Sequence, residues 1–254
     1  MSLNNSLKIR RSQQMKTNKS AWKIIARREL SAYFTSPAAY IVCVLFLLFS
    51  GFMFFSTFFL YARAELRNFF RYLPLLFSVF IPALTMRSLS EENRSGSIET
   101  LLTLPVTVGE IVAGKFIAAF LSVIVMLIPT LSFALACYIL GSPDSGPIIG
   151  GYLGAIFLAS SYTAIGLFAS SLSKNQIISF LLASSVCLVL SLLDSMIVLF
   201  PGNVANVISF ICSGSHFTSI SRGVLDSRDI LYFVSITAIF CALTVHGISR
   251  SRKG

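Results

Sequence analysis

Long stretches without a charged residue are the feature that most constrains this chain. The six gaps that can hold a helix separate Glu29 from Arg63, Arg71 from Arg87, Lys115 from Asp144, Asp144 from Lys174, Lys174 from Asp194 and Asp229 from Arg250, and they contain 33, 15, 28, 29, 19 and 20 residues. A transmembrane helix needs about 20 mostly apolar residues. Only 12% of the 254 residues are charged, against about 25% in a water-soluble domain. The pattern predicts an all-α membrane protein with six transmembrane helices, and it excludes an ordinary soluble enzyme or a disordered binding protein.

The charge gaps also predict where the six spans lie. We place them at about 38–60, 69–88, 110–140, 147–171, 176–200 and 230–249, inside a transmembrane domain that covers 20–254. Residues 1–19 are basic and lack a hydrophobic period, so we expect them to be disordered. Prolines and glycines interrupt 201–229, which favours short helices dipping into the outer leaflet, where irregular backbone must be buried in protein.

The distribution of basic residues predicts the orientation of the spans. With six spans, the segments on the side of the two termini hold 15 Lys and Arg, and those on the opposite side hold the remaining five of the 20. Because cytoplasmic loops are enriched in Lys and Arg, both termini are predicted to face the cytoplasm.

Residues 20–34, just before the first span, have the pattern of an amphipathic helix. Trp22, Ile25, Leu30 and Tyr33 recur at helical spacing, while Arg27 and the basic residues next to it fall largely on another side. Such a helix lies in the membrane interface, and Ser36-Pro37 turns the chain into the bilayer.

The polar segment 90–110, between the second and third spans, carries four of the ten acidic residues. Ser97 can cap a short helix that ends at Pro105 and presents an apolar patch of leucines. Thr107 and Glu110 then form a capping box for the third span, with Val106 and Ile111 placed as its hydrophobic staple. On this chemistry alone, the short helix is either a docking knob for a cytoplasmic partner or a plain interfacial linker.

Three sequence patterns carry a family resemblance. The pattern E-E-x-R-S-G-S-I-E-T-L-L-T-L-P-V-x-x-x-E-I-V-x-G-K-F at 91–116 resembles the coupling segment of ABC-2 family permeases, the membrane subunits of ATP-binding-cassette transporters. The pattern R-R-E-L-x-A-Y-F-x-S-P-x-A-Y at 27–40 is similar to that family's interfacial helix and its entry to the first span. The pattern S-H-F-x-S-I-S-R-G-V-L-D-S-R-D-I-L-Y-F at 215–233 resembles the outer loop and sixth span of the gliding-motility type of permease.

The resemblance implies a role for each of these segments. It implies that the coupling segment contacts a separate ATP-binding subunit through Glu91, Glu92, Arg94, Gly96, Ser97, Glu99, Leu101, Leu102 and Pro105. The residues that the resemblance singles out in the interfacial helix are Trp22, Arg27, Arg28, Glu29 and Tyr33. Those in the outer loop are His216, Phe217, Arg222, Gly223 and Asp229. It further implies a pathway formed by two permease copies, as a homodimer or with a similar permease, and ATP and magnesium bound by the partner subunit rather than by this chain. An auxiliary protein of the cell envelope is an additional partner to consider.

Several residues that suggest chemistry have plainer interpretations. Gly109 to Lys115 matches the first seven positions of a phosphate-binding P-loop, but Phe116 stands where the magnesium-binding hydroxyl belongs. We therefore expect no ATPase activity in this chain, and we expect Lys115 to snorkel toward the membrane surface. Asp194 is a candidate pathway residue, or it marks the water boundary of the fifth span. The histidines and the five scattered cysteines predict neither a metal site nor a catalytic site.

A stripe of small residues along the fourth span predicts close helix packing, either within the subunit or at a dimer interface. Gly146, Gly150 and Gly154 follow one another at a spacing of four. The leading functional hypothesis is an ABC transporter permease subunit with no enzymatic activity of its own. The alternative is an ATP-independent channel or carrier, for which we expect several charges inside the spans or an inverted repeat.

Overall fold

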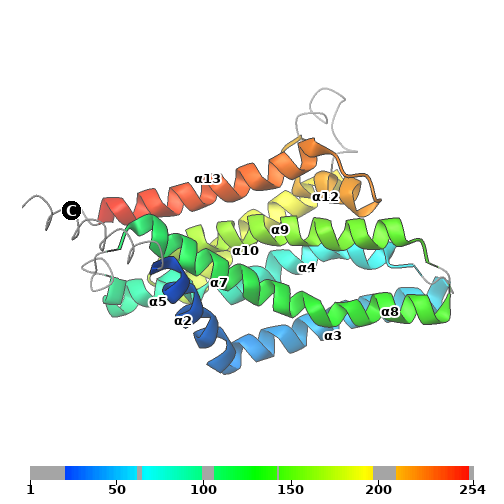
Figure 1. The fold of residues 1–254 in the computed structure, drawn as a ribbon, viewed down its shortest axis with the longest axis horizontal. Helices are drawn as coiled ribbons and strands as arrows, with labels where there is room; N and C mark the ends of the chain where they lie inside the picture. Colours follow the sequence, from blue (N-terminus) through cyan, green and yellow to red (C-terminus); the bar gives the residue numbers. More distant parts are fainter. Residues whose placement is uncertain (1–20, 62–64, 99–105, 142, 197–209, 252–254) are drawn as a thin grey trace, which may run out of the picture.

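The computed structural model describes residues 21–61, 65–98, 106–141, 143–196 and 210–251. The described part is helical and contains six helices that are long and apolar enough to cross a membrane, as the charge gaps predicted. In Figure 1 these helices run side by side as an elongated bundle, with α2 and α5 at one end and α12 at the other. We call these the α2 end and the α12 end.

The helices follow the chain in an up-and-down order. Their bounds are α2 Ala21–Thr35, α3 Pro37–Tyr61, α4 Arg67–Thr85, α5 Arg87–Ser95, α7 Val108–Leu127, the 3₁₀ turn η1 Ile128–Thr130, α8 Leu131–Leu140, α9 Ser145–Leu172, α10 Gln176–Met196, α12 Ser213–Ser221 and α13 Ser227–Ser251. The expected disorder of 1–19, and the greater part of the predicted short helix at 97–104, lie outside the described residues.

Helix α9 lies at the centre of the bundle. It packs against α4, α5, α7, α10, α12 and α13, and most of its residues are buried. The helices α3 and α13 are instead largely exposed apolar helices, as are large parts of α10. A helix that is apolar all round and exposed suits lipid or another protein chain rather than water.

Glycines explain the central position of α9. A Cβ atom at Gly150 would lie 2.4 Å from the carbonyl oxygen of Ile220 in α12, and one at Gly151 would lie 2.3 Å from the ring of Phe70 in α4. The small-residue stripe therefore serves packing within the subunit, where the missing side chains let neighbouring helices approach closely.

Two elements differ from the sequence prediction. Residues 87–95 form the helix α5, which continues directly from α4, although the sequence suggested a polar loop after the second span. The third span is not continuous, because it breaks at η1, where Pro129 has no N–H to give to the preceding turn. The predicted capping box is confirmed, since Thr107 and Glu110 cap the start of α7 reciprocally.

Candidate functional site

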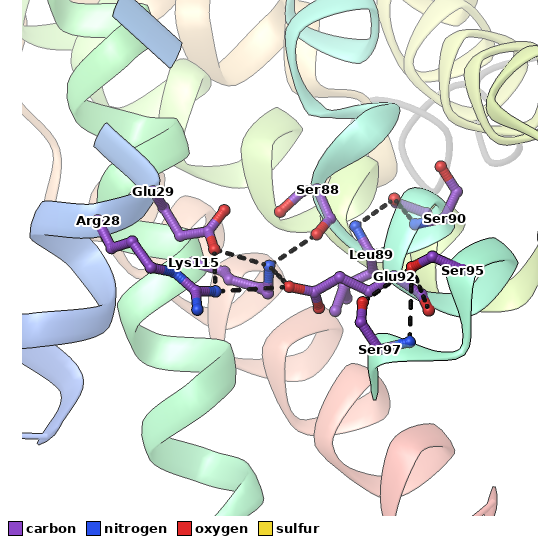
Figure 2. Close-up of polar contacts among 10 residues, drawn as sticks. Arg28, Glu29, Ser88, Leu89, Ser90, Glu92, Ser95, Ser97 and Lys115 are labelled. Carbon is purple, nitrogen blue, oxygen red and sulfur yellow. Dashed lines mark hydrogen bonds and ion pairs between the residues drawn. The ribbon is translucent and has the colours of Figure 1, made fainter. Parts of the chain in front are cut away.

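A buried lysine lies at the α2 end, where α2, α5 and α7 meet. The side chain of Lys115, on α7, is 1% exposed, and its Nζ donates to the backbone carbonyl of Ser88 at 2.8 Å. The same nitrogen lies 2.8 Å from Oε1 of Glu92, on α5, and 3.2 Å from Oε1 of Glu29, on α2. Figure 2 shows these side chains converging on the ammonium group. The expectation that Lys115 snorkels to the surface is therefore wrong, because two carboxylates reach it inside the protein.

Arg28 completes the arrangement. Its guanidinium donates to Oε1 of Glu29 at 2.8 Å and lies 3.7 Å from Oε1 of Glu92. The hydrogen bond to Glu29 raises the pKa of Arg28 above its ordinary value. We call Arg28, Glu29, Glu92 and Lys115 the four-charge cluster. Its two positive and two negative charges balance, which offsets the cost of removing Lys115 from water.

Local sequence brings α2 close enough to take part. A Cβ atom at Gly114 would lie 2.9 Å from the backbone oxygen of Trp22 and 2.9 Å from the side chain of Ile25, so α2 rests directly on α7 at this glycine. Ile25 and Ile111 form a small buried cluster with Val106 packed against it, which confirms the predicted hydrophobic staple. The amphipathic pattern of 20–34 thus gives a helix that packs partly on protein.

A serine of α9 holds α5 in place. The hydroxyl of Ser170 accepts hydrogen bonds from the backbone N–H groups of Leu89 and Ser90, at 2.9 and 3.0 Å, and donates to the carbonyl of Met86 at 3.0 Å. It therefore serves backbone groups at the junction of α4 and α5. Leu89 itself is fully buried. Because α5 is anchored to the central helix, a displacement of α5 also acts on α4 and α9.

Some of the predicted coupling residues belong to the described part of the chain, and the others lie outside it. Glu92 lies in the four-charge cluster, whereas Glu91 and Arg94 are exposed on α5. Gly96 ends α5 in a left-handed conformation, with φ of 73°, and Ser97 follows it, exposed. Glu99, Leu101, Leu102 and Pro105 lie outside the described residues.

The predicted interfacial residues lie on α2. Arg28 and Glu29 belong to the four-charge cluster, and Arg27 is exposed. Trp22 is half-buried, with the ammonium of Lys23 5.5 Å from its ring centre. Burial of the hydroxyl of Tyr33 raises the pKa of this residue above its ordinary range.

At the α12 end the predicted outer-loop residues form a second buried pair. Nδ1 of His216, on α12, lies 2.6 Å from Oδ1 of Asp229, on α13, and its Nε2 lies 3.1 Å from the carbonyl oxygen of Phe210. The carbonyl oxygen can only accept, so Nε2 is the donor in this hydrogen bond. The ring of Tyr232 stacks on the imidazole.

The remaining outer residues are dispersed around this pair. Phe217 is buried in the core, and Gly223 has a positive φ of 87° where the chain leaves α12. Asp194 is half-buried at the end of α10 and lines a cavity of about 410 Å³ together with Arg222. Because Asp194 lines this open cavity at the end of α10, its position is compatible both with a pathway residue and with the water boundary of the fifth span.

The sequence analysis missed the pairing of Lys115 and the role of Ser170. A signal for the first was present, since Lys115 is the one charged residue between Glu110 and Asp144 and charges within apolar helices are costly unless they are paired. No comparable signal marked Ser170, because it is one of many serines in the predicted spans.

Comparison with protein families decides the assignment. Residues 23–250 match the model of the family described as ABC-2 family transporter protein. The chain belongs to the ABC-2 transporter family. This match runs from α2 to α13 and therefore includes both the four-charge cluster and the pair of His216 with Asp229. Comparison with curated proteins gives no match.

Membership of this family bears on whether the residues of the site are catalytic. ABC-2 permeases are membrane subunits without catalytic activity of their own. In this ABC-2 protein, the P-loop-like residues Gly109 and Gly114 lie inside the helix α7, and the lysine that follows them is already paired with two carboxylates. The four-charge cluster is thus suited to joining three helices mechanically rather than to holding a phosphate.

Proposed function

We propose that this chain is the permease subunit of an ABC-2 transporter, that two copies form the translocation pathway, and that a separate subunit supplies the energy by binding ATP with magnesium. The pathway is formed either by a homodimer or with a similar permease, and the gliding-motility type is the closest in sequence pattern. The family match supports the permease role and does not favour an ATP-independent channel or carrier.

The observation that carries the proposal is the four-charge cluster. It ties α5, which leads directly into the proposed docking segment 97–105, to α2 and α7. A push on the docking segment would enter α5 through Gly96 and pass to α4, because α5 continues from α4. The cluster would carry the same push to α2 and α7, and Ser170 would carry it to α9.

The proposed orientation follows from the same end of the molecule. The α2 end holds the start of α2, the start of α7 and the end of α13, next to the basic segments of the sequence. We propose that it faces the cytoplasm, where an ATP-binding subunit has access to it. The α12 end would then face outward, and α12 would lie at the depth of the outer leaflet.

The test combines ATP hydrolysis with assembly. The purified chain is expected to hydrolyse no ATP, and co-expression with its ATP-binding subunit should give a complex that does. Changing Leu101→Ala together with Glu99→Ala should weaken this complex, because truncating a well-packed interface leucine costs about 1–2 kcal/mol, or roughly 5- to 30-fold in affinity.

A matched control lies at the α12 end. Leu225 and Glu65 are exposed there, so changing Leu225→Ala together with Glu65→Ala removes the same side-chain types without touching the proposed docking segment. This control should assemble normally. If both double variants assemble equally well and stimulate ATP hydrolysis equally, segment 97–105 is an interfacial linker and not a docking segment.

A further inference from the structure

Two adjoining cavities lie beside α2, at the α2 end of the bundle. A cavity of about 300 Å³, which we call the chamber, lies between α2, α3 and the junction of α4 with α5, and its mainly apolar walls also include the charged residues Glu29, Arg87 and Glu91. An apolar groove of about 170 Å³ lies between α3 and α7. The two cavities share Tyr33, Ala39 and Leu84, so they are parts of one continuous space.

The groove exists because α3 and α7 diverge at the α2 end. Helix α3 packs on α4, whereas α7 packs on α2. Figure 1 shows α2 running from the start of α3 to α7 at this end of the bundle. Tyr40 and Val125, which line the groove, are exposed on α3 and α7, two helices that can span a membrane, so we expect the groove to be accessible to lipid.

The walls of the groove are two facing stripes. On α3 the stripe consists of Ala39, Cys43 and Leu47, and on α7 it includes Ser122 and Met126. Residues four apart share one face of a helix. Nearly all of the exposed wall is apolar, and the hydroxyl of Ser122 is turned to the carbonyl of Ala118 within its own helix. Water gains no partners in such a space.

The chamber differs from the groove because charged residues stand among its apolar ones. The carboxylates of Glu29 and Glu91 and the guanidinium of Arg87 line it, which favours a group that carries both an ammonium and a phosphate. The buried hydroxyls of Tyr33 and Ser88 face each other in its wall and bond to no other described group. They are free to bond to a polar group that enters the chamber.

We propose that this space binds one phospholipid with an amine headgroup, from the leaflet at the α2 end. One acyl chain occupies the groove, and the ammonium and phosphate occupy the chamber. The length fits, because the groove spans eight residues of α3, or about 12 Å at 1.5 Å per residue, and one leaflet of the hydrocarbon core is about 15 Å deep. A helix of a second copy, about 10 Å across, is too wide for a groove of 170 Å³.

The site places a lipid headgroup against the four-charge cluster, since Glu29 belongs to both. An occupied chamber would restrain α2 relative to α5, because residues of both helices line it. The inference needs only that the chain spans a bilayer, so it does not depend on coupling to ATP hydrolysis.

The test uses a phosphatidylethanolamine that carries a photoreactive diazirine in one acyl chain. The full chain is reconstituted in nanodiscs that contain this lipid and irradiated, and the labelled peptides are identified by mass spectrometry. Labelling should concentrate on the groove stretches of α3 and α7. Val125→Trp, which fills the groove, should reduce this labelling at least threefold.

The matched control is Leu121→Trp on the same helix. Leu121 is 40% exposed and Val125 is 39% exposed, but Leu121 does not line the groove, so its replacement should leave the labelling unchanged. A second pair on α3, Leu47→Trp in the groove and Leu48→Trp on the lipid-facing side, repeats the comparison if one variant fails to fold.

The headgroup is tested by competition. Unlabelled phosphatidylethanolamine should displace the probe at least threefold better than phosphatidylglycerol, and Glu91→Gln should reduce that preference. Equal labelling in the groove-filling and control variants, or labelling spread evenly over the apolar surface, would mean that only bulk lipid surrounds the chain and would overturn the proposal. A change of oligomeric state on filling the groove would overturn it as well, because the groove would then receive a second copy.

Discussion

The two ends of the bundle are held together by different kinds of contact. At the α2 end, four charged side chains from three helices meet around Lys115, and the helices α2 and α5 are short. At the α12 end, α12 rests on α9 with backbone against backbone at Gly150. The buried pair of His216 with Asp229, together with the ring of Tyr232 stacked on the imidazole, ties α12 to α13.

This difference has mechanical consequences. Ion pairs between long side chains tolerate small displacements, since a carboxylate can shift between an ammonium and a guanidinium without being left unpaired. A helix crossing at glycine has no such freedom, because close-packed atoms resist any approach. We therefore expect α5, which is joined to α2 and α7 through the four-charge cluster, to shift more readily than α12, whereas α2 itself rests closely on α7 at Gly114.

The largest effect is expected from Lys115→Ala. Removing one partner of a buried charge cluster leaves the two carboxylates with only the half-exposed Arg28, and such changes cost about 3–5 kcal/mol. Thermal unfolding of the purified chain in detergent should show a large drop in melting temperature. Lys174→Ala, at an exposed lysine of the same end, should change stability by no more than about 0.5 kcal/mol.

A rescue variant sharpens this prediction. The triple change Lys115→Met, Glu29→Gln and Glu92→Gln removes the buried charges together, and replacing a complete ion cluster by neutral groups is often neutral. It should recover most of the lost stability while disturbing coupling to the ATP-binding subunit. No recovery would mean that Lys115 matters for its packing rather than for its charge.

A smaller effect is expected from Gly150→Ala, at the α12 end. The added methyl group would meet the backbone oxygen of Ile220 at 2.4 Å, and backbone cannot move aside as a side chain does. Overpacking of this kind costs about 1–3 kcal/mol. Gly109→Ala, at a helical position with open space around its Cβ, serves as the control and should be neutral or slightly stabilising. Equal melting temperatures for the two variants would contradict a rigid α12 end.

The smallest effect concerns a thiol of the α12 end. Burial, with a further contribution from the nearby charge of Asp194, raises the pKa of Cys212 from 9.0 to about 11. The folded protein thus favours the protonated thiol, so its contribution to stability is complete below pH 9 and is lost as the pH rises toward about 11. At pH 8 the thiolate fraction is lowered about 100-fold by this shift.

Alkylation measures this directly. With iodoacetamide at pH 8, peptide mass spectrometry should show Cys212 reacting at least 100-fold more slowly than a cysteine introduced by Ser97→Cys at the exposed α2 end. Similar alkylation rates for the two cysteines would show that α12 opens readily, which would contradict a fixed α12 end.

The sequence by itself determined the number and the class of the helices. Five uncharged gaps of 19 to 33 residues, and a sixth of 15 residues, leave few alternatives. An unpaired backbone group in lipid is too costly for any structure but a helix or a closed barrel. The capping box at Thr107 and Glu110 was also readable, since both partners lie within one turn of the chain.

Only the tertiary structure decided which distant residues meet. Lys115 looked like a snorkelling residue until α2 and α5 placed Glu29 and Glu92 beside it, 86 and 23 positions away in the chain. Likewise, α5 became a helix because Leu89 is buried and Ser170 of α9 bonds to its backbone. Local sequence sets hydrophobic period and caps, whereas the pairing of charges across helices depends on how the helices pack, and the packing is fixed by contacts such as Gly114 against α2.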